Sequence, residues 1–161
     1  MTLYDTDWYA WVHEQITLLE QGCFEALDLP HLMEELDLMA GNALGELYDR
    51  LIVLLAHLLK LKVAAELLPG IYDRAQRGWR LTCREQRRRL ARLLRRNPSL
   101  QPTVPEEVTE AFEVARLQAL AALQMDEAWL PESCPWSPEQ VLDAAFWPDE
   151  PQDSDTTYVR P

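Results

Sequence analysis

The chain has few cysteines and few glycines. Only five glycines are present, and Leu, Ala, Glu and Arg dominate between the termini, so helix is favoured and long strand patterns are absent. The three cysteines are widely spaced and form no CxxC pair, which argues against a disulfide framework and against a zinc ribbon. They are Cys23, Cys83 and Cys134. We therefore expect free thiols in a cytoplasmic protein.

Membrane spans, export signals and cofactor motifs are also missing. The most apolar segment, residues 51–59, lies between Arg50 and Lys60 and is too short to cross a bilayer. The first eleven residues are acidic, whereas a secretory signal would begin with basic residues. No glycine-rich phosphate loop, GxSxG elbow or HExxH motif occurs, so we expect no cofactor and no metal.

Apolar spacing predicts an all-α, single-domain helical bundle of about four long helices plus a short C-terminal helix. Capping residues, prolines and glycines place these helices at about 5–22, 28–65, from 73 or 78 to 96, from 105 onward and near 137–139. The second helix should be broken or bent around Gly41 and Gly45, and Pro69 with Gly70 should turn the chain before the third. The domain should cover residues 1–148, and residues 149–161 read as a loose polar tail.

The second helix carries one continuous apolar face, which should lie at the centre of the core. Its members are Leu32, Leu36, Ala43, Leu47, Leu51, Leu54, Leu58 and Leu61.

Positive charge is concentrated in one segment. Ten arginines and a single acid, Glu85, lie between Arg74 and Arg96, which gives this segment +9 in a chain of net charge -12 and leaves -21 elsewhere. We expect most of these arginines to pair with acids of neighbouring helices, because a guanidinium grips a carboxylate with two parallel hydrogen bonds. The acids considered are Asp5, Asp7, Glu14, Glu20, Glu34, Glu35 and Asp37.

Nucleic acid, an acidic protein and a membrane surface are the other destinations for these arginines. A basic helix is the electrostatic feature that nucleic-acid binding requires. The acidic remainder of the chain argues against it, because that charge would repel phosphates. We therefore rank a protein partner above nucleic acid, and we expect no membrane partner.

One polar seam follows the edge of the second helix, and His57 lies in its most apolar part. A histidine there is either a general base oriented by a glutamate, or a structural residue bonded to a carboxylate or a backbone carbonyl. The structural alternative is favoured. We further expect Glu34 or Glu35, with His57, Glu85 and Arg88, to converge between the second and third helices as a buried ionic lock or a catalytic cluster.

Five ordered blocks of sequence carry a family resemblance: "YDTDWYAWVHEQITLL", "HLMEELDLMA", "LLAHLLK", "GWRLTCREQRRRLARLLRRNPSL" and "ESCPWSPEQVLDAAFWP". Over roughly residues 4–148 the chain resembles the domain of unknown function 29 family, found mostly in cyanobacteria and proteobacteria. The resemblance implies an all-α bacterial domain with no established reaction. The patterned positions of the family would fall on Asp7, Trp11, Glu34, Glu35, His57, Lys60, Trp79, Glu85, Arg88, Pro98 and Ser99.

These features favour a non-enzymatic helical module that binds another protein, in one version as a homodimer. The first alternative is a small hydrolase or nuclease-like enzyme that uses His57 with Glu35 or Glu85, and arginines of the third helix to hold an anionic substrate. The second alternative is nucleic-acid binding through the basic helix at 74–96.

Overall fold

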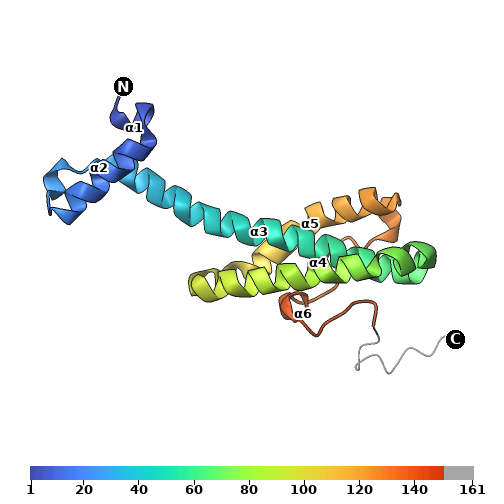
Figure 1. Cartoon of the computed structure of the whole chain (residues 1–161). Helices are drawn as coiled ribbons and strands as arrows, with labels where there is room; N and C mark the ends of the chain where they lie inside the picture. Colours follow the sequence, from blue (N-terminus) through green and yellow to red (C-terminus); the bar gives the residue numbers. More distant parts are fainter. Residues whose placement is uncertain (151–161) are drawn as a thin grey trace. The chain divides into compact units, whose positions relative to one another are not determined.

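The computed structural model describes residues 1–150, and these residues form helices and turns without a β-strand (Figure 1). The α-helices are α1 (Leu3–Thr6), α2 (Trp8–Glu20), α3 (Leu29–Leu67), α4 (Pro69–Arg96), α5 (Val104–Leu123) and α6 (Pro138–Leu142). Short 3-10 turns cover Phe24–Ala26, Pro98–Thr103 and Glu127–Trp129. The all-α prediction is confirmed. No helix within the described residues is both long and apolar enough to cross a bilayer.

Residue contacts group the chain into two compact units, Met1–Asn42 and Ala43–Pro161. We call them the N-terminal unit and the C-terminal unit and describe each by itself. The single domain over residues 1–148 stays a prediction. The loose tail predicted for residues 149–161 lies, from residue 151 on, outside the described residues.

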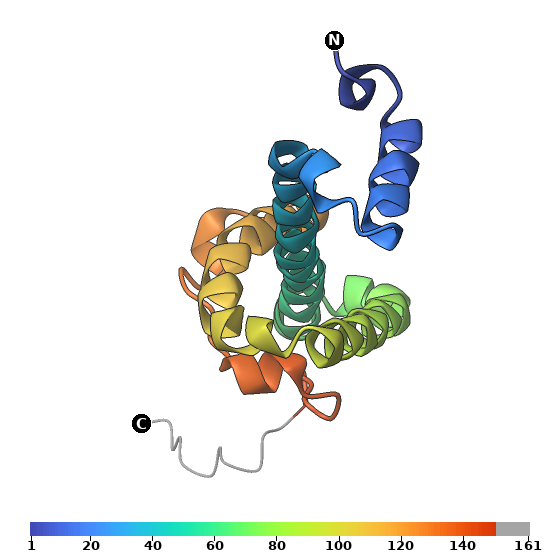
Figure 2. The same cartoon turned by 90° about the vertical axis from the view of Figure 1, so that its left-hand side faces the viewer.

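The C-terminal unit is built on the second half of α3, with α4 and α5 on either side of it (Figure 2). From Leu51 to Leu61 almost every apolar side chain of α3 is buried, since neighbouring elements cover this helix on several faces. Helix α4 adds Cys83 and Leu90 to the core, and α5 adds Phe112. The short α6 contacts both α4 and α5.

The junction between α3 and α4 is tighter than predicted. We expected Pro69 and Gly70 to form a turn and the next helix to begin at Asp73 or Gly78, but α4 begins at Pro69 itself. Proline is well tolerated in the first turn of a helix, where its missing N–H has no acceptor to lose. Helix α3 also continues through Gly41 and Gly45 as one element of 39 residues.

The apolar face predicted for α3 is buried only in part. Burial is complete from Leu47 onward, whereas Leu36 is 62% exposed and Leu32 is only partly buried. In the N-terminal unit only Trp11 and Gln15 are buried. The same apolar spacing therefore makes a core in one unit and an exposed surface in the other.

Candidate binding surfaces

Arg87 is the arginine of α4 that the structure buries. Its Nε donates to the carbonyl oxygen of Val141 and its Nη1 to that of Phe146, both at 2.9 Å. The guanidinium carbon also lies 5.1 Å from the ring centre of Trp147, within the range of a cation–π contact. Burial lowers the pKa of Arg87 from its usual value. The side chain thus fastens the C-terminal segment to α4 through backbone acceptors.

Arg88, the residue expected in a buried ionic lock, is exposed. A step of one residue turns a helix by 100°, so Arg87 and Arg88 point in different directions. The polar partners of the buried arginine are also carbonyl oxygens rather than a carboxylate. The expectation for Arg88 is therefore replaced by a structural role for Arg87.

Arg80 makes the second attachment of the C-terminal segment. Its two terminal nitrogens pair at 2.8 Å with Asp149 and Glu150, and Tyr72 donates its hydroxyl to the same Asp149 oxygen. The Asp149 side chain is fully buried, and this hydrogen bond raises the pKa of Tyr72. Residues 149 and 150, which the sequence assigned to the loose tail, are therefore held by α4. Trp147 is buried beside them.

His57 lies half-buried on α3, and its Nδ1 is 2.8 Å from the carbonyl oxygen of Val53. Because a carbonyl can only accept, this nitrogen carries the proton. Burial lowers the pKa of His57, which favours the neutral ring. Of the alternatives left open by the sequence, the geometry corresponds to a structural histidine bonded to a backbone carbonyl. His57 lines neither of the two pockets described for the chain.

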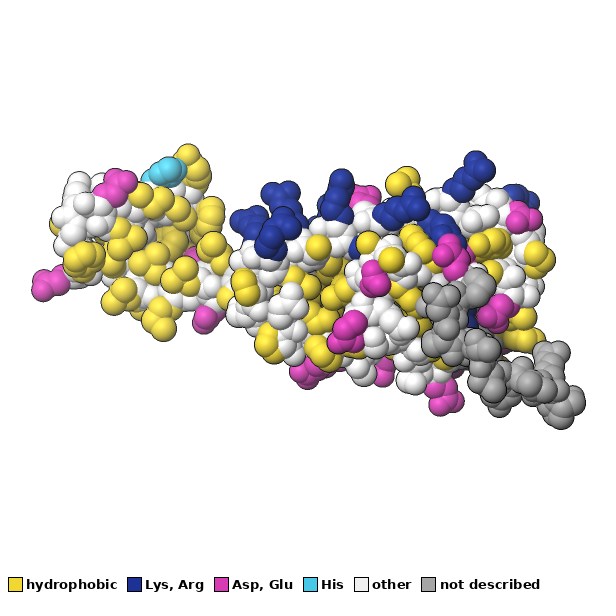
Figure 3. Space-filling view, turned by 90° about the horizontal axis from the view of Figure 1, so that it is seen from below, with side chains coloured by type: hydrophobic (Ala, Val, Ile, Leu, Met, Phe, Trp, Pro, Cys, Tyr) yellow, Lys and Arg dark blue, Asp and Glu magenta, His cyan; other side chains and the backbone are white. Residues whose placement is uncertain are grey.

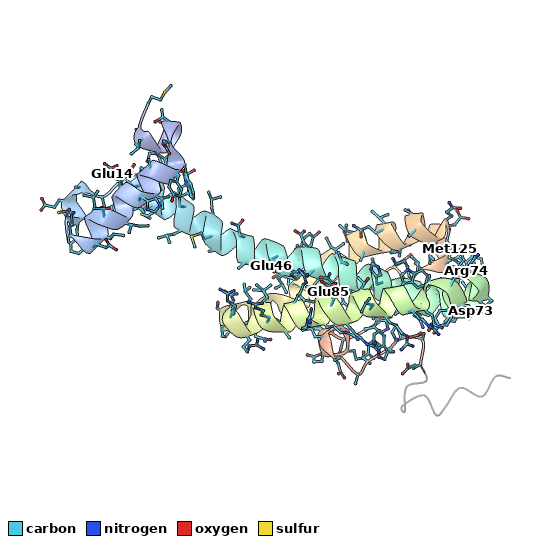
Figure 4. The ribbon with its side chains drawn as sticks, in the orientation of Figure 1. Glu14, Glu46, Asp73, Arg74, Glu85 and Met125 are labelled. Carbon is cyan, nitrogen blue, oxygen red and sulfur yellow. The ribbon has the colours of Figure 1, made fainter. Side chains whose placement is uncertain are left out.

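The other residues of the C-terminal unit that the sequence predicted to be functional contact residues other than His57. Glu85 pairs with Arg89 on α4, and Figure 4 labels it on that helix. Lys60 lies 5.4 Å from the ring centre of Trp79, and burial lowers the pKa of Lys60. Burial also raises the pKa of the Cys83 thiol to about 12, so this cysteine is not a thiolate at neutral pH.

Two of the predicted acids of the N-terminal unit, Asp7 and Glu35, have hydrogen-bond partners inside that unit. Asp7 caps α2 by accepting from the Ala10 amide at 2.9 Å. Glu35 accepts from the Tyr4 hydroxyl at 2.8 Å and from the Trp8 indole at 2.9 Å. Glu34, on the same helix, is exposed. The acids expected to neutralise arginines thus include two that fix local structure instead.

Asp28 and His31 form a cluster that the sequence analysis missed. Asp28 is 2.7 Å from Nδ1 of His31 and accepts from the buried Trp11 indole at 3.2 Å. The hydrogen bond with Asp28 raises the pKa of His31, and the same bond lowers the pKa of Asp28. The side-chain oxygen of Gln15 accepts from the Asp28 amide. The spacing of an acid and a histidine three residues apart at a helix start was the available signal.

The N-terminal unit exposes a row of apolar side chains on the first half of α3. Leu29, Met33 and Leu36 are 56%, 66% and 62% exposed, and the exposed Ala40 follows. Spacings of four, three and four residues place all four on one face of a helix. We call this row the apolar stripe. Figure 3 displays the hydrophobic side chains gathered on one face of this unit.

Helix α4 presents a row of exposed arginines, which we call the arginine stripe. Its members are Arg74, Arg77, Arg84, Arg88, Arg92 and Arg95. At 100° per residue they occupy an arc of about 80°. Figure 4 labels Arg74, with Asp73 beside it, near the start of α4. Within the described part of the C-terminal unit, no acid forms an ion pair with any of the six.

The larger of the described pockets lies in the C-terminal unit and has a volume of 610 Å³. Its lining mixes Lys62 and Glu66 with Trp136, Gln140 and Phe146. Among the described residues, no three histidine, cysteine, aspartate or glutamate side chains are grouped as metal ligands. The pocket therefore offers polar and aromatic contacts.

No characterised protein and no solved structure matches the chain. A family model described as Domain of unknown function DUF29 matches residues 3–147, which is most of the sequence. The five sequence blocks quoted above lie within or largely within this range. The chain belongs to the DUF29 family.

Proposed function

We propose that the chain is a cytoplasmic module that binds another protein through the apolar stripe of its N-terminal unit. The observation that carries the proposal is the exposure of Leu29, Met33 and Leu36, each above one half. Large apolar side chains that form a continuous exposed patch are typical of interaction sites. Apolar residues at heptad-like spacing are the pattern by which one helix packs against another. The four residues of the apolar stripe have this spacing, so a helix is a suitable partner. The three free cysteines support a reducing compartment.

Charge narrows the partner to a basic amphipathic helix. Residues 1–42 contain nine acids and neither lysine nor arginine. Asp37 is exposed about 40° round the helix from the stripe, and Glu34 is exposed further round. A second copy of the same stripe would bring like charges together, which disfavours binding. A partner helix with apolar residues at matching positions and lysines or arginines at its edges would satisfy both features.

Two synthetic peptides test this proposal with the full chain. One has leucines at spacings of three and four residues and lysines elsewhere, and the other replaces each lysine by glutamate. By isothermal titration calorimetry we expect the lysine peptide to bind, with an affinity that falls as salt rises, and the glutamate peptide not to bind. Absence of binding by the lysine peptide would contradict the proposal.

A pair of double variants locates the site. Met33→Ser with Leu36→Ser should weaken binding of the lysine peptide at least about tenfold, because apolar area is lost from the contact. Leu81→Ser with Leu117→Ser is the matched control, since these leucines are 66% and 56% exposed in the C-terminal unit. Equal affinity of both variants would place the binding site elsewhere.

A further inference from the structure

The arginine stripe of α4 is long, and among the described residues of its own unit none of its members forms an ion pair with an acid. From Arg74 to Arg95 it extends along 21 residues, which is about 31 Å at 1.5 Å per residue. Successive arginines of the stripe are three, four or seven residues apart, so neighbouring charges repel one another. An anion that lies along this face would remove that repulsion. Figure 3 shows lysine and arginine side chains as a row along one edge of the C-terminal unit.

Of the four remaining arginines of α4, Arg96 is exposed at the last position of the helix, and the other three make structural contacts. Arg80 pairs with Asp149 and Glu150, and Arg89 pairs with Glu85. Arg87 is buried on two carbonyl oxygens. Three arginines therefore serve the fold and six lie on one exposed row, of which Arg84 also lies 5.5 Å from the ring centre of Trp147. The acids that the sequence offered as partners of these arginines lie in the N-terminal unit, so that expectation stays a prediction, and the ion pairs of α4 within the described C-terminal unit are those of Arg80 and Arg89.

The acidic residues of α5 lie away from this row. Glu106, Glu110 and Glu113 are exposed on α5, which lies on the other side of α3 from α4 (Figure 2). Several acidic side chains of this unit follow the edge opposite the arginines in Figure 3. A helix with its side chains is about 10 Å wide. Charges on opposite edges are therefore separated by more than the Debye length of about 8 Å at physiological salt.

A nucleic acid fits the stripe better than an acidic protein. Double-stranded DNA carries one charge per about 1.7 Å of its axis, so phosphates are available along the full length of the row. A single acidic face of a protein offers few carboxylates over such a distance; the exposed glutamates of α5, for example, extend over only eight residues. The arginine fork also matches phosphate oxygens. The arc of the stripe holds, besides its six arginines, only the exposed Leu81, and this composition suits contact with the backbone of the nucleic acid rather than with bases.

We propose that the arginine stripe of α4 is a sequence-independent binding site for the phosphate backbone of nucleic acid. This site is separate from the apolar stripe, and it does not depend on the protein-binding function proposed above. Contact with six phosphates predicts a slope near -5 when the logarithm of the association constant is plotted against the logarithm of salt concentration.

Fluorescence anisotropy with the full chain and labelled 20-base-pair DNA duplexes of two unrelated sequences tests the site. We expect micromolar dissociation constants at low salt that are equal for both sequences. The variant Arg88→Gln, Arg92→Gln and Arg95→Gln keeps good helix formers at exposed positions, so it should fold. Its slope should be about half that of the wild type, and its affinity at low salt should fall at least tenfold.

A second triple variant controls for net charge. Gln101→Glu, Gln118→Glu and Ala122→Glu are substitutions at exposed positions outside α4, and they lower the net charge by the same three units. This variant should keep the wild-type slope. Equal losses in both triple variants would overturn the proposal, as would absence of binding by the wild type. Binding of poly-glutamate without binding of the duplex would also overturn it and would indicate an acidic protein partner.

Discussion

The same helical spacing of apolar residues is buried in the C-terminal unit and largely exposed in the N-terminal unit. In the C-terminal unit, residues such as Leu51, Leu54 and Leu58 are fully buried. Among the described residues, seventeen large apolar side chains are exposed, and twelve of them lie in residues 1–42. One unit therefore has a core of its own, and the other carries apolar side chains that a partner can cover.

Charge divides the two units in the same way. All fifteen lysines and arginines lie beyond residue 42, while the N-terminal unit has nine acids and no cation apart from its histidines. In the proposals above, an apolar surface bordered by acids would favour a cationic partner and the arginine stripe an anionic one. The difference between the units teaches that charge separates them as clearly as burial does.

The sharpest comparison of the units is between two phenylalanines. Phe112 is 1% exposed in the C-terminal core and Phe24 is 64% exposed in the N-terminal unit. Phe112→Ala should lower the free energy of unfolding by about 3–5 kcal/mol because it opens a cavity. Phe24→Ala should cost under about 0.5 kcal/mol. Urea denaturation measures both values, and similar losses would mean that the N-terminal unit also has a well-packed interior.

A comparison of Arg87 with Arg88 tests how the C-terminal segment is held on α4. Arg87→Ala should cost about 2–4 kcal/mol, because the carbonyl oxygens of Val141 and Phe146 would lose a buried donor. Arg88→Ala should cost under about 0.5 kcal/mol, since its side chain is exposed. Urea melts with tryptophan emission report both. A larger loss for Arg88→Ala would restore the lock first expected from the sequence.

The fold class was predictable because apolar periodicity responds directly to helix geometry. The central core of α3 from Leu47 onward follows from that spacing. The exposure of Leu36 did not follow, because an apolar stripe has the same sequence pattern whether another element covers it or solvent does. Periodicity identifies a face, and it does not identify the neighbour.

The contacts of the site residues were harder to predict, because every residue has a backbone carbonyl and the sequence does not show which of them accepts a hydrogen bond. The carbonyl oxygens that bind Arg87 belong to Val141 and Phe146, which are apolar residues far along the chain. On a helical wheel Arg87 lies about 20° from Leu94, at the edge of the buried face, and this position was the available signal. Arg88 lies about 100° further from the buried face than Arg87 does. The carbonyl partner of His57 could be anticipated as one alternative, since a buried imidazole requires a hydrogen-bond partner.

The smallest expected difference between the two units is in the pKa values of their histidines. The hydrogen bond with Asp28 raises the pKa of His31, while burial lowers the pKa of His57. In a two-dimensional NMR titration of the ring Hε1 protons, His31 should therefore lose its proton at higher pH than His57. Asp28→Asn should move the His31 midpoint downward and leave that of His57 unchanged.

The two shifts have opposite effects on stability. Because the folded pKa of His31 exceeds the unfolded value of about 6.5, its contribution is complete below that pH and is lost as pH rises through the folded pKa. Because the folded pKa of His57 is below the unfolded value, the unfolded chain binds the extra proton, and stability falls as pH drops below about 6.5. Equal midpoints for the two rings would contradict the effect of Asp28 on His31 together with the effect of burial on His57. A His31 midpoint that ignores Asp28→Asn would contradict the assignment in the N-terminal unit alone.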